Sequence, residues 1–220
     1  QIYSWSDANK TTPKTSAPAL SETIELFRPY VEEGRNIVCF SISNSMSSSG
    51  NVMQLAAEEL NAQDLITVID SANLSTGIGL LVIEAAILAQ NNKTAAEISV
   101  AVENLKPYVR ASFVVDTLTY LHRGGRCSAI AAMAGGLLKL HPQIIVEHGA
   151  MKPTKKYRGK MDSVILSYVK DMEPALKHAR PDRVFITHSG CEPTIINAVR
   201  SYLEGLGIFR EILETRAGGV

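Results

Sequence analysis

The sequence has no excess of charge of either sign, since its 22 acidic and 22 basic side chains balance. Proteins that bind nucleic acid or anionic membranes typically carry surplus Lys and Arg, so we expect no nucleic-acid partner. The longest apolar run, residues 77–89, contains Glu84 and is shorter than the roughly 20 residues that a membrane span requires. We therefore expect a core helix there and no membrane span.

Cysteine is scarce, and Cys39, Cys127 and Cys191 are far apart and lack C-x-x-C spacing. This pattern fits a reducing compartment and gives no support to a zinc site. The histidines show neither H-x-x-x-H nor H-E-x-x-H spacing, and no signal peptide opens the chain. We expect a cytoplasmic protein with no bound metal.

Short apolar runs alternate with helical patterns in the first half of the chain, after the polar, turn-rich residues 4–19. The expected strands are 36–43, 65–70 and 111–116, and the expected helices start at Ser21, span 51–60 and 76–90, and start again at Thr94, where Glu97 completes a capping box. Pro29 should kink the first helix or end it early. Alternation of this kind predicts a Rossmann-like parallel sheet with helices on both faces.

The regular alternation of strands and helices ends in the second half, which we expect to be a mixed α/β domain. Its expected elements are a short helix, the loop 123–126, an alanine-rich helix 128–140, a hairpin of 143–148 and 151–159 meeting at Gly149, helices 162–178 and 192–206, and strands 183–189 and 209–215. The predicted domains are therefore 1–111 and 112–220.

Two serine-rich segments follow expected strands of the parallel sheet: the serine loop, "SISNSMSSSGN" (residues 41–51), and the 70–79 loop, "DSANLSTGIG". Ligands bind at the carboxyl ends of such strands, and the helix that follows each loop begins with unpaired N–H groups that favour an anion. Hydroxyls add directional donors, and one helix needs only one cap. This favours Ser47 and Ser49 as ligands, although Ser47, Ser49, Ser75 and Thr76 could each simply cap their own helices.

A serine hydrolase is an alternative interpretation of the serine loop. Its turn would need the pattern G-x-S-x-G, whereas Ser45 and Met46 precede Ser47 here. His188, at the end of the expected strand 183–189, could act as a base for Ser47, but spacing indicates no acid partner. A binder of another small carboxylate or phosphate is a third possibility.

The segment "HRGGRCS" (residues 122–128) is a second candidate loop. Its paired glycines permit close backbone approach, and the planar fork of Arg126 suits a carboxylate or phosphate. The alternative is a tight turn with a solvated arginine. The segment is neither a Walker nor a Rossmann motif.

These segments, together with "KTSAP" (14–18), "VIDSANLSTGIGLLVIEAA" (68–86), "FVVDTLTYLHRGGRCS" (113–128), "VEHGAMKPTKKYRG" (146–159) and "FITHSG" (185–190), resemble the DegV family of fatty-acid-binding proteins. The family includes the lipid-binding subunit of bacterial fatty acid kinase. The resemblance implies two α/β domains with one acyl chain in an apolar tunnel between them. It places the carboxylate near Thr15, Ser16, Ser47 and Ser49, and it gives Arg126 a role in phosphate handling or kinase docking.

The resemblance further implies a non-enzymatic lipid carrier with no cofactor, which presents a long-chain fatty acid to a separate ATP-dependent kinase. The serine loop departs from the family pattern, because Ser48, Ser49 and Gly50 stand where Gly, Thr and an aromatic residue are usual. Family members also begin with a strand carrying Asp-Ser-Thr and continue to a histidine that contacts the head group. We expect that native N-terminal strand and that C-terminal segment to be missing here.

Overall fold

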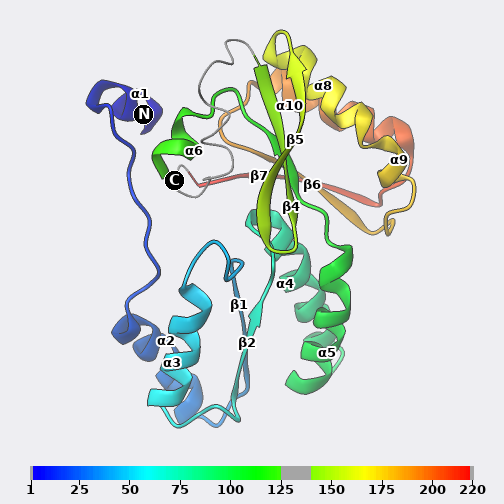
Figure 1. Cartoon of the computed structure of the whole chain (residues 1–220). Helices are drawn as coiled ribbons and strands as arrows, with labels where there is room; N and C mark the ends of the chain where they lie inside the picture. Colours follow the sequence, from blue (N-terminus) through cyan, green and yellow to red (C-terminus); the bar gives the residue numbers. More distant parts are fainter. Residues whose placement is uncertain (1, 125–139, 219–220) are drawn as a thin grey trace. The chain divides into compact units, whose positions relative to one another are not determined.

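The computed structural model describes residues 2–124 and 140–218 (Figure 1). The chain forms a mixed α/β structure that divides into two compact units. The first-half unit comprises residues 15–111 and the hairpin tip, residues 146–151; the second-half unit comprises residues 1–14, 112–145 and 152–220. One boundary between the units lies between residues 111 and 112, and residues 1–14 and 146–151 group across it. As a statement about folding domains, the division into 1–111 and 112–220 stays a prediction.

The first-half unit is built around two parallel strands, β1 (Ile37–Ser41) and β2 (Ile66–Asp70). They pair in register from Ile37 opposite Ile66 to Ser41 opposite Asp70. The other elements of the unit are α2 (Leu20–Glu32), α3 (Ser49–Glu59), α4 (Ser75–Gln90), α5 (Ala95–Leu105) and a 3₁₀ turn, η1 (Lys106–Tyr108).

Helices cover both faces of this strand pair, as the alternating pattern predicts (Figure 1). Successive strand side chains point to opposite faces, so the two faces contact different helices. Ile37, Cys39 and Val68 pack with Phe27 of α2 and with α3, whereas Val38, Phe40 and Ile69 pack with α4 and α5. The apolar helix α4 is accordingly a core element, and none of the described helices is both long and apolar enough to span a membrane.

The third expected strand of the parallel sheet lies elsewhere, and that part of the prediction was wrong. Residues Ser112–Val114 form β3, which pairs antiparallel with β4 (Leu140–Glu147), so that Phe113 lies opposite the fully buried Ile144. So short a strand carries no local signal of its partner, which here is the strand that contains the buried Ile144.

An N-terminal helix, α1 (Ile2–Asn9), occupies part of the segment that looked turn-rich. It contacts α6 (Thr119–Gly124) through several side chains. The rings of Tyr3 and Tyr120 lie 5.0 Å apart, and the Tyr120 hydroxyl donates to Asp7 over 3.0 Å. Tertiary contacts therefore stabilise a helix that its own polar sequence does not indicate.

Helix α2 begins one residue earlier than expected and continues past its proline. Ala19 rather than Ser21 is the N-cap, and its N–H donates to the side chain of Glu22 over 3.2 Å. Pro29 lies inside the helix, which ends at Glu32. The proline is exposed, so the carbonyl that loses its partner there can turn to water.

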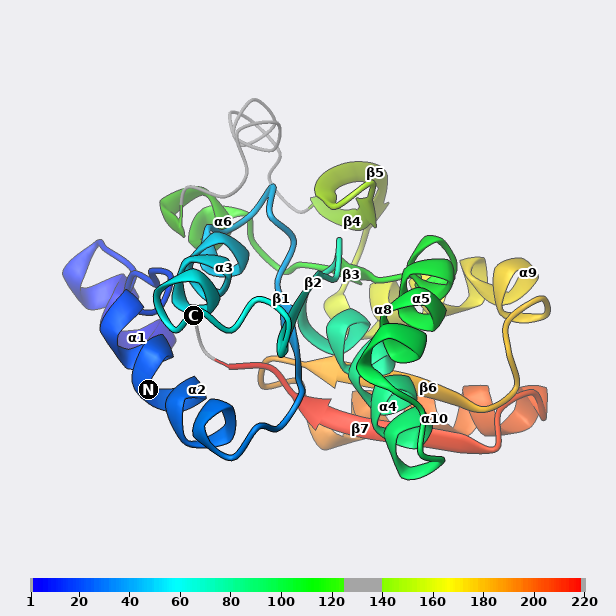
Figure 2. The same ribbon diagram turned by 90° about the horizontal axis from the view of Figure 1, so that it is seen from below.

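The second-half unit contains two sheets. One has the order β3, β4, β5 (Ala150–Arg158), and the other is a parallel pair of β6 (Arg183–His188) and β7 (Glu211–Arg216), seen side by side in Figure 2. Strands β4 and β5 form the expected hairpin, with positive φ angles at His148 (50°) and Gly149 (77°), the signature of a two-residue type I′ turn.

Three further helices complete the described part of this unit: α8 (Met161–Asp171), α9 (Glu173–Leu176) and α10 (Pro193–Leu206). The single helix expected over 162–178 is therefore two helices. Val169 of α8 and Val199 and Leu203 of α10 form a core with one face of β6 and β7. The alanine-rich helix expected over 128–140 falls, except for its last residue, outside the described residues.

Candidate functional site

The serine loop and the 70–79 loop leave the first-half unit at the same edge. Their strands end at Ser41 and Asp70, which lie opposite each other in the parallel register. Backbone hydrogen bonds join the two loops beyond the strands, from Ser71 N–H to Ser41 O (3.2 Å) and from Ser43 N–H to Asn73 O (2.9 Å). The expectation that both segments meet at the carboxyl ends of the strands is therefore confirmed.

Ser47 and Ser49 lie together at the start of α3. Their hydroxyl oxygens are 2.8 Å apart, and the Ser49 N–H also donates to Ser47 Oγ over 3.2 Å. Ser47 thus satisfies one of the orphan N–H groups of α3, while the N-cap position itself belongs to Ser48, which makes no capping bond with its side chain. Capping therefore explains one hydrogen bond of the Ser47 hydroxyl, and it explains no hydrogen bond of the Ser49 hydroxyl.

A second hydroxyl pair, Ser43 and Ser45, has a different role. Ser45 Oγ donates to the carbonyl of Gly149 in the hairpin tip, and it lies 3.1 Å from Ser43 Oγ. Ser43 Oγ also accepts the Ser45 N–H over 3.3 Å. Because the Ser45 proton is committed to Gly149, the Ser43 proton must lie in the bond between the two hydroxyls.

Counting protons separates the two pairs. Ser43 and Ser45 have two hydroxyl protons, and both are used within the protein. Ser47 and Ser49 also have two, but a single bond between their oxygens uses only one, and neither hydroxyl has a further acceptor among the described residues. The pair Ser47 and Ser49 therefore keeps one proton to donate, at a helix N-terminus whose dipole favours a negative charge.

Asp70 and Asn73 bond the backbone of the two loops at this edge. One oxygen of Asp70, Oδ1, accepts the N–H of Asn44 (3.3 Å) and that of Ala72 (2.8 Å). Asn73, 3% exposed, accepts the N–H of Leu74 with its side chain over 3.0 Å. These residues were not among the predicted site residues, although Asp and Asn at the start of a loop are a known signal for side chains that bond the nearby backbone.

Three other predicted site residues, Thr15, Ser16 and Arg126, lie outside the serine loop. Thr15 and Ser16 lie in the extended segment before α2, and both are exposed. Arg126 lies outside the described residues. The predicted roles of Thr15, Ser16 and Arg126 stay predictions.

His188 ends β6 in the second-half unit, where its Nε2 lies 3.5 Å from Glu214 Oε1 of β7. Glu214 is an acid neighbour that spacing in the sequence did not indicate. Among the described residues, no hydrogen bond joins Ser47 to a histidine, and the oxygen of Ser47 is bonded by Ser49.

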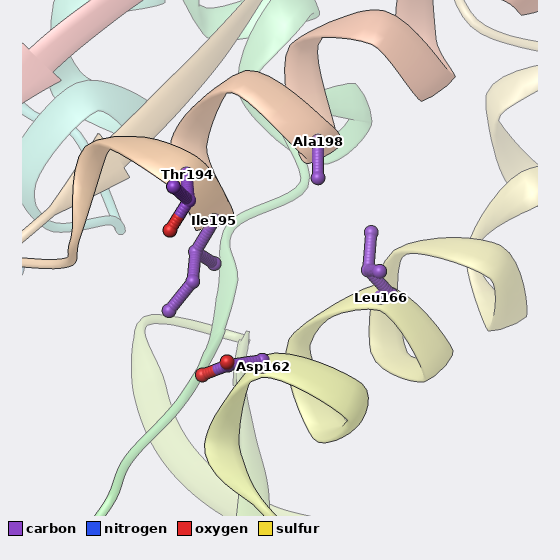
Figure 3. Close-up of a pocket in the computed structure, with 5 residues that line it drawn as sticks. All are labelled: Asp162, Leu166, Thr194, Ile195 and Ala198. Carbon is purple, nitrogen blue, oxygen red and sulfur yellow. The ribbon is translucent and has the colours of Figure 1, made fainter.

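Within residues 2–124 and 140–218, no group of three or more His, Cys, Asp and Glu side chains could hold a metal ion. A shallow hollow lies between α8 and α10 and contains none of the predicted site residues (Figure 3). Its lining residues are Asp162, Leu166, Thr194, Ile195 and Ala198.

The fold and the two hydroxyl pairs define a mixed α/β protein with a donor-lined turn at the end of a parallel strand pair. The model of the DegV family matches residues 1–218. A DegV domain-containing protein from Clostridium acetobutylicum is 31% identical over 173 residues, which cover 78% of this chain and 62% of the relative. The chain belongs to the DegV family, and it spans about three fifths of the length of this curated relative.

Solved structures agree with this fold. A DegV family protein from Thermus thermophilus, whose structure is described as showing fatty acid binding, superimposes with a TM-score of 0.86 at 26% identity, over 100% of this chain and 77% of its own. The fatty acid kinase (Fak) B3 protein of Streptococcus pneumoniae, loaded with linoleic acid, superimposes with a TM-score of 0.79 at 20% identity, over 94% of this chain and 72% of its own. At 20% identity the second likeness concerns the fold alone.

Proposed function

We propose that this chain binds a long-chain fatty acid and presents its carboxylate to a separate ATP-dependent fatty acid kinase, which forms an acyl phosphate. The observation that carries the proposal is the pair Ser47 and Ser49, which keeps one uncommitted proton at the N-terminus of α3. The carboxylate accepts that proton, and Thr15 and Ser16 supply further donors.

The relatives support the acyl part of this proposal. The Thermus thermophilus protein is described as binding fatty acid, and membership of the DegV family extends over nearly the whole chain. The kinase part rests on the family resemblance, on the fold shared with the Fak B3 protein and on the lack of a P-loop in this sequence. Arg126 is proposed for phosphate handling or kinase docking, and an apolar tunnel is proposed for the acyl chain.

Tail and head of the ligand have different energetic roles. Burying an acyl tail of about 16 carbons contributes on the order of 12 kcal/mol at roughly 0.8 kcal/mol per methylene. Each hydrogen bond to the charged head adds about 1.5 to 3 kcal/mol. Tail burial therefore sets the affinity, whereas the hydroxyls set the orientation that phosphorylation needs.

Lipid extraction is the direct test. The purified protein should release a long-chain fatty acid that mass spectrometry identifies in near-stoichiometric amount, and delipidated protein should take up palmitate again. Protein that carries no acyl chain and takes none up would contradict the proposal. Stoichiometric labelling of Ser47 by a fluorophosphonate probe would instead support the rival function, an acyl ester hydrolase that uses Ser47 and His188.

Turnover with a fatty acid kinase tests the site residues. Thr15→Ala should slow phosphorylation of the bound lipid about tenfold or more, the effect of one lost hydrogen bond to a charge. Ser47→Ala should slow it by about threefold, because Ser49 still has a proton to donate, and acyl binding should stay nearly unchanged in both variants. Arg126→Ala should impair turnover more than lipid retention. Equal loss of binding and turnover in all three variants would place the head group elsewhere.

A further inference from the structure

The tip of the β4–β5 hairpin is packed into the proposed head-group site. We propose that Gly149 is a positioning residue, which fixes the serine loop through Ser45 so that the proton of Ser47 and Ser49 points at the ligand's carboxylate. This inference rests on the proposed function for the ligand, but its structural part concerns contacts within the first-half unit alone.

Gly149 leaves no room for a side chain. It is buried, with a φ angle of 77°, and a Cβ atom built on it would lie 2.6 Å from Ser43 Oγ and 3.7 Å from the Cα of Ala72. The tip therefore contacts the serine loop, and a side chain at this position would also meet the 70–79 loop. Glycine is the residue that permits both the left-handed backbone and this close approach.

Hydrogen bonds lead from Gly149 to the backbone of Ser47. The Gly149 carbonyl accepts from Ser45, whose hydroxyl in turn accepts from Ser43. The carbonyl of Ser43 accepts the N–H of Met46 (2.8 Å) and that of Ser47 (3.1 Å). Ser43 thus holds the base of the turn that carries Ser47, and Ser45 links Ser43 to the hairpin tip.

The Gly149 carbonyl also determines which hydroxyl can reach an anion. While it accepts the Ser45 proton, Ser45 cannot donate to a ligand, and Ser43 cannot either. Without that acceptor the Ser45 hydroxyl would be free to compete with Ser47 and Ser49 for the carboxylate. The hairpin tip therefore selects the donor pair as well as fixing its position.

The test compares an acid with its uncharged ester. Dissociation constants for palmitate and for methyl palmitate are measured on wild-type protein and on Ser45→Ala, Ser45→Thr and Ser48→Ala. The ratio of the two constants isolates recognition of the head group, because the acyl tail is the same. Ser48 is the matched control, since it is an exposed serine of the same loop and no hydrogen bond of its side chain is found in the described chain.

We expect Ser45→Ala to lower the preference for the acid about fivefold, part of the tenfold or more that a bond to a charge supplies, and to change methyl palmitate binding by less than about twofold. Ser45→Thr should restore the preference, and Ser48→Ala should keep it. Equal weakening of both ligands in Ser45→Ala would show a purely structural role and overturn the inference, as would an unchanged ratio.

Amide hydrogen exchange in the unliganded protein gives an independent readout. Ser45→Ala should speed exchange at Met46 and Ser47, whose N–H groups donate to Ser43, and exchange in α5 should not change. Unchanged exchange at both amides would overturn the positioning role. Wild-type protein that does not distinguish palmitate from its ester would instead overturn the proposed function, even if the exchange result held.

Discussion

The serines of the serine loop differ in what they can offer a ligand, although the sequence makes them look alike. Ser41 and Ser43 are 1% and 2% exposed, so their hydroxyls face the protein. The proton of Ser45 belongs to Gly149. Ser48 is exposed at the N-cap of α3. Ser47 and Ser49 remain as the partly buried pair with a proton to spare. At the scale of residues, hydrogen-bond direction rather than serine content defines the candidate site.

The shared proton predicts that Ser47→Ala and Ser49→Ala are not additive. Each single variant still has one hydroxyl with a free proton, so the preference for palmitate over methyl palmitate should fall by about threefold or less. The double variant has no donor and should lose about tenfold or more, the value of a bond to a charged group. Isothermal titration with both ligands measures this, and a double loss equal to the product of the single losses would contradict it.

Cys39 should be a poor nucleophile. Burial raises the pKa of its thiol to about 11, so the reactive thiolate at pH 8 is roughly one part in a thousand. Iodoacetamide should therefore label Cys39 far more slowly in folded protein than in urea, as measured by peptide mass spectrometry. Native labelling at the unfolded rate would disprove the burial.

The same pKa shift predicts how the stability of the folded protein changes with pH. A thiol whose folded pKa lies above its ordinary value of 9.0 binds its proton more tightly in the folded state. The stability it contributes is present below about pH 9 and falls as the pH rises toward 11. Cys39→Ser should lack this part of the alkaline loss of stability.

Elements with local signals were predictable, and elements with distant partners were not. Thr94 caps α5 as its sequence indicates, with the reciprocal bond from the Thr94 N–H to Glu97 at 2.9 Å. The two-residue turn at Gly149 was readable in the same way. By contrast, α1 depends on Tyr120, more than a hundred residues away, and the partner of β3 depends on Ile144.

The residues of the candidate site also differ in whether local sequence could predict their roles. Ser47 and Ser49 could be predicted because they follow a strand and precede a helix in sequence. The role of Ser45 could not, because its acceptor lies 104 residues further along the chain. Composition reports which groups are present, whereas the partner of each group is fixed only by the tertiary structure.

Thr94→Ala should test whether α5 needs its cap. The hydroxyl of Thr94 accepts the N–H of Glu97 over 3.2 Å, and losing such a cap costs about 1 kcal/mol. Urea denaturation should show this loss in the free energy of unfolding, whereas Ser201→Ala, at an exposed position of α10, should change it by less than about 0.5 kcal/mol. Equal effects of both variants would contradict the capping role.

At the scale of the whole molecule, the chain passes between its two compact units four times. The crossings lie at residues 14/15, 111/112, 145/146 and 151/152. This connectivity differs from that of two domains on one linker, because the backbone crosses between the units at four places.

Acyl chain length tests the proposed division between tail and head. Each added methylene should tighten binding by up to about fourfold, which corresponds to roughly 0.8 kcal/mol, until the tail no longer fits. A series from octanoate to stearate, measured by the rise in Tm and by competition with a fluorescent fatty acid, checks this. No dependence on length would indicate a site for a compact anion.

The bond between Ser45 and Gly149 also has a consequence for synthesis of the protein. A ribosome makes the serine loop early, but the acceptor that orders its hydroxyls is added 104 residues later. Closing so long a loop is slow and entropically costly. A nascent chain that ends before the hairpin has Ser47 and Ser49 without the bond that positions them, so recognition of the carboxylate should begin only after residue 149 has left the ribosome.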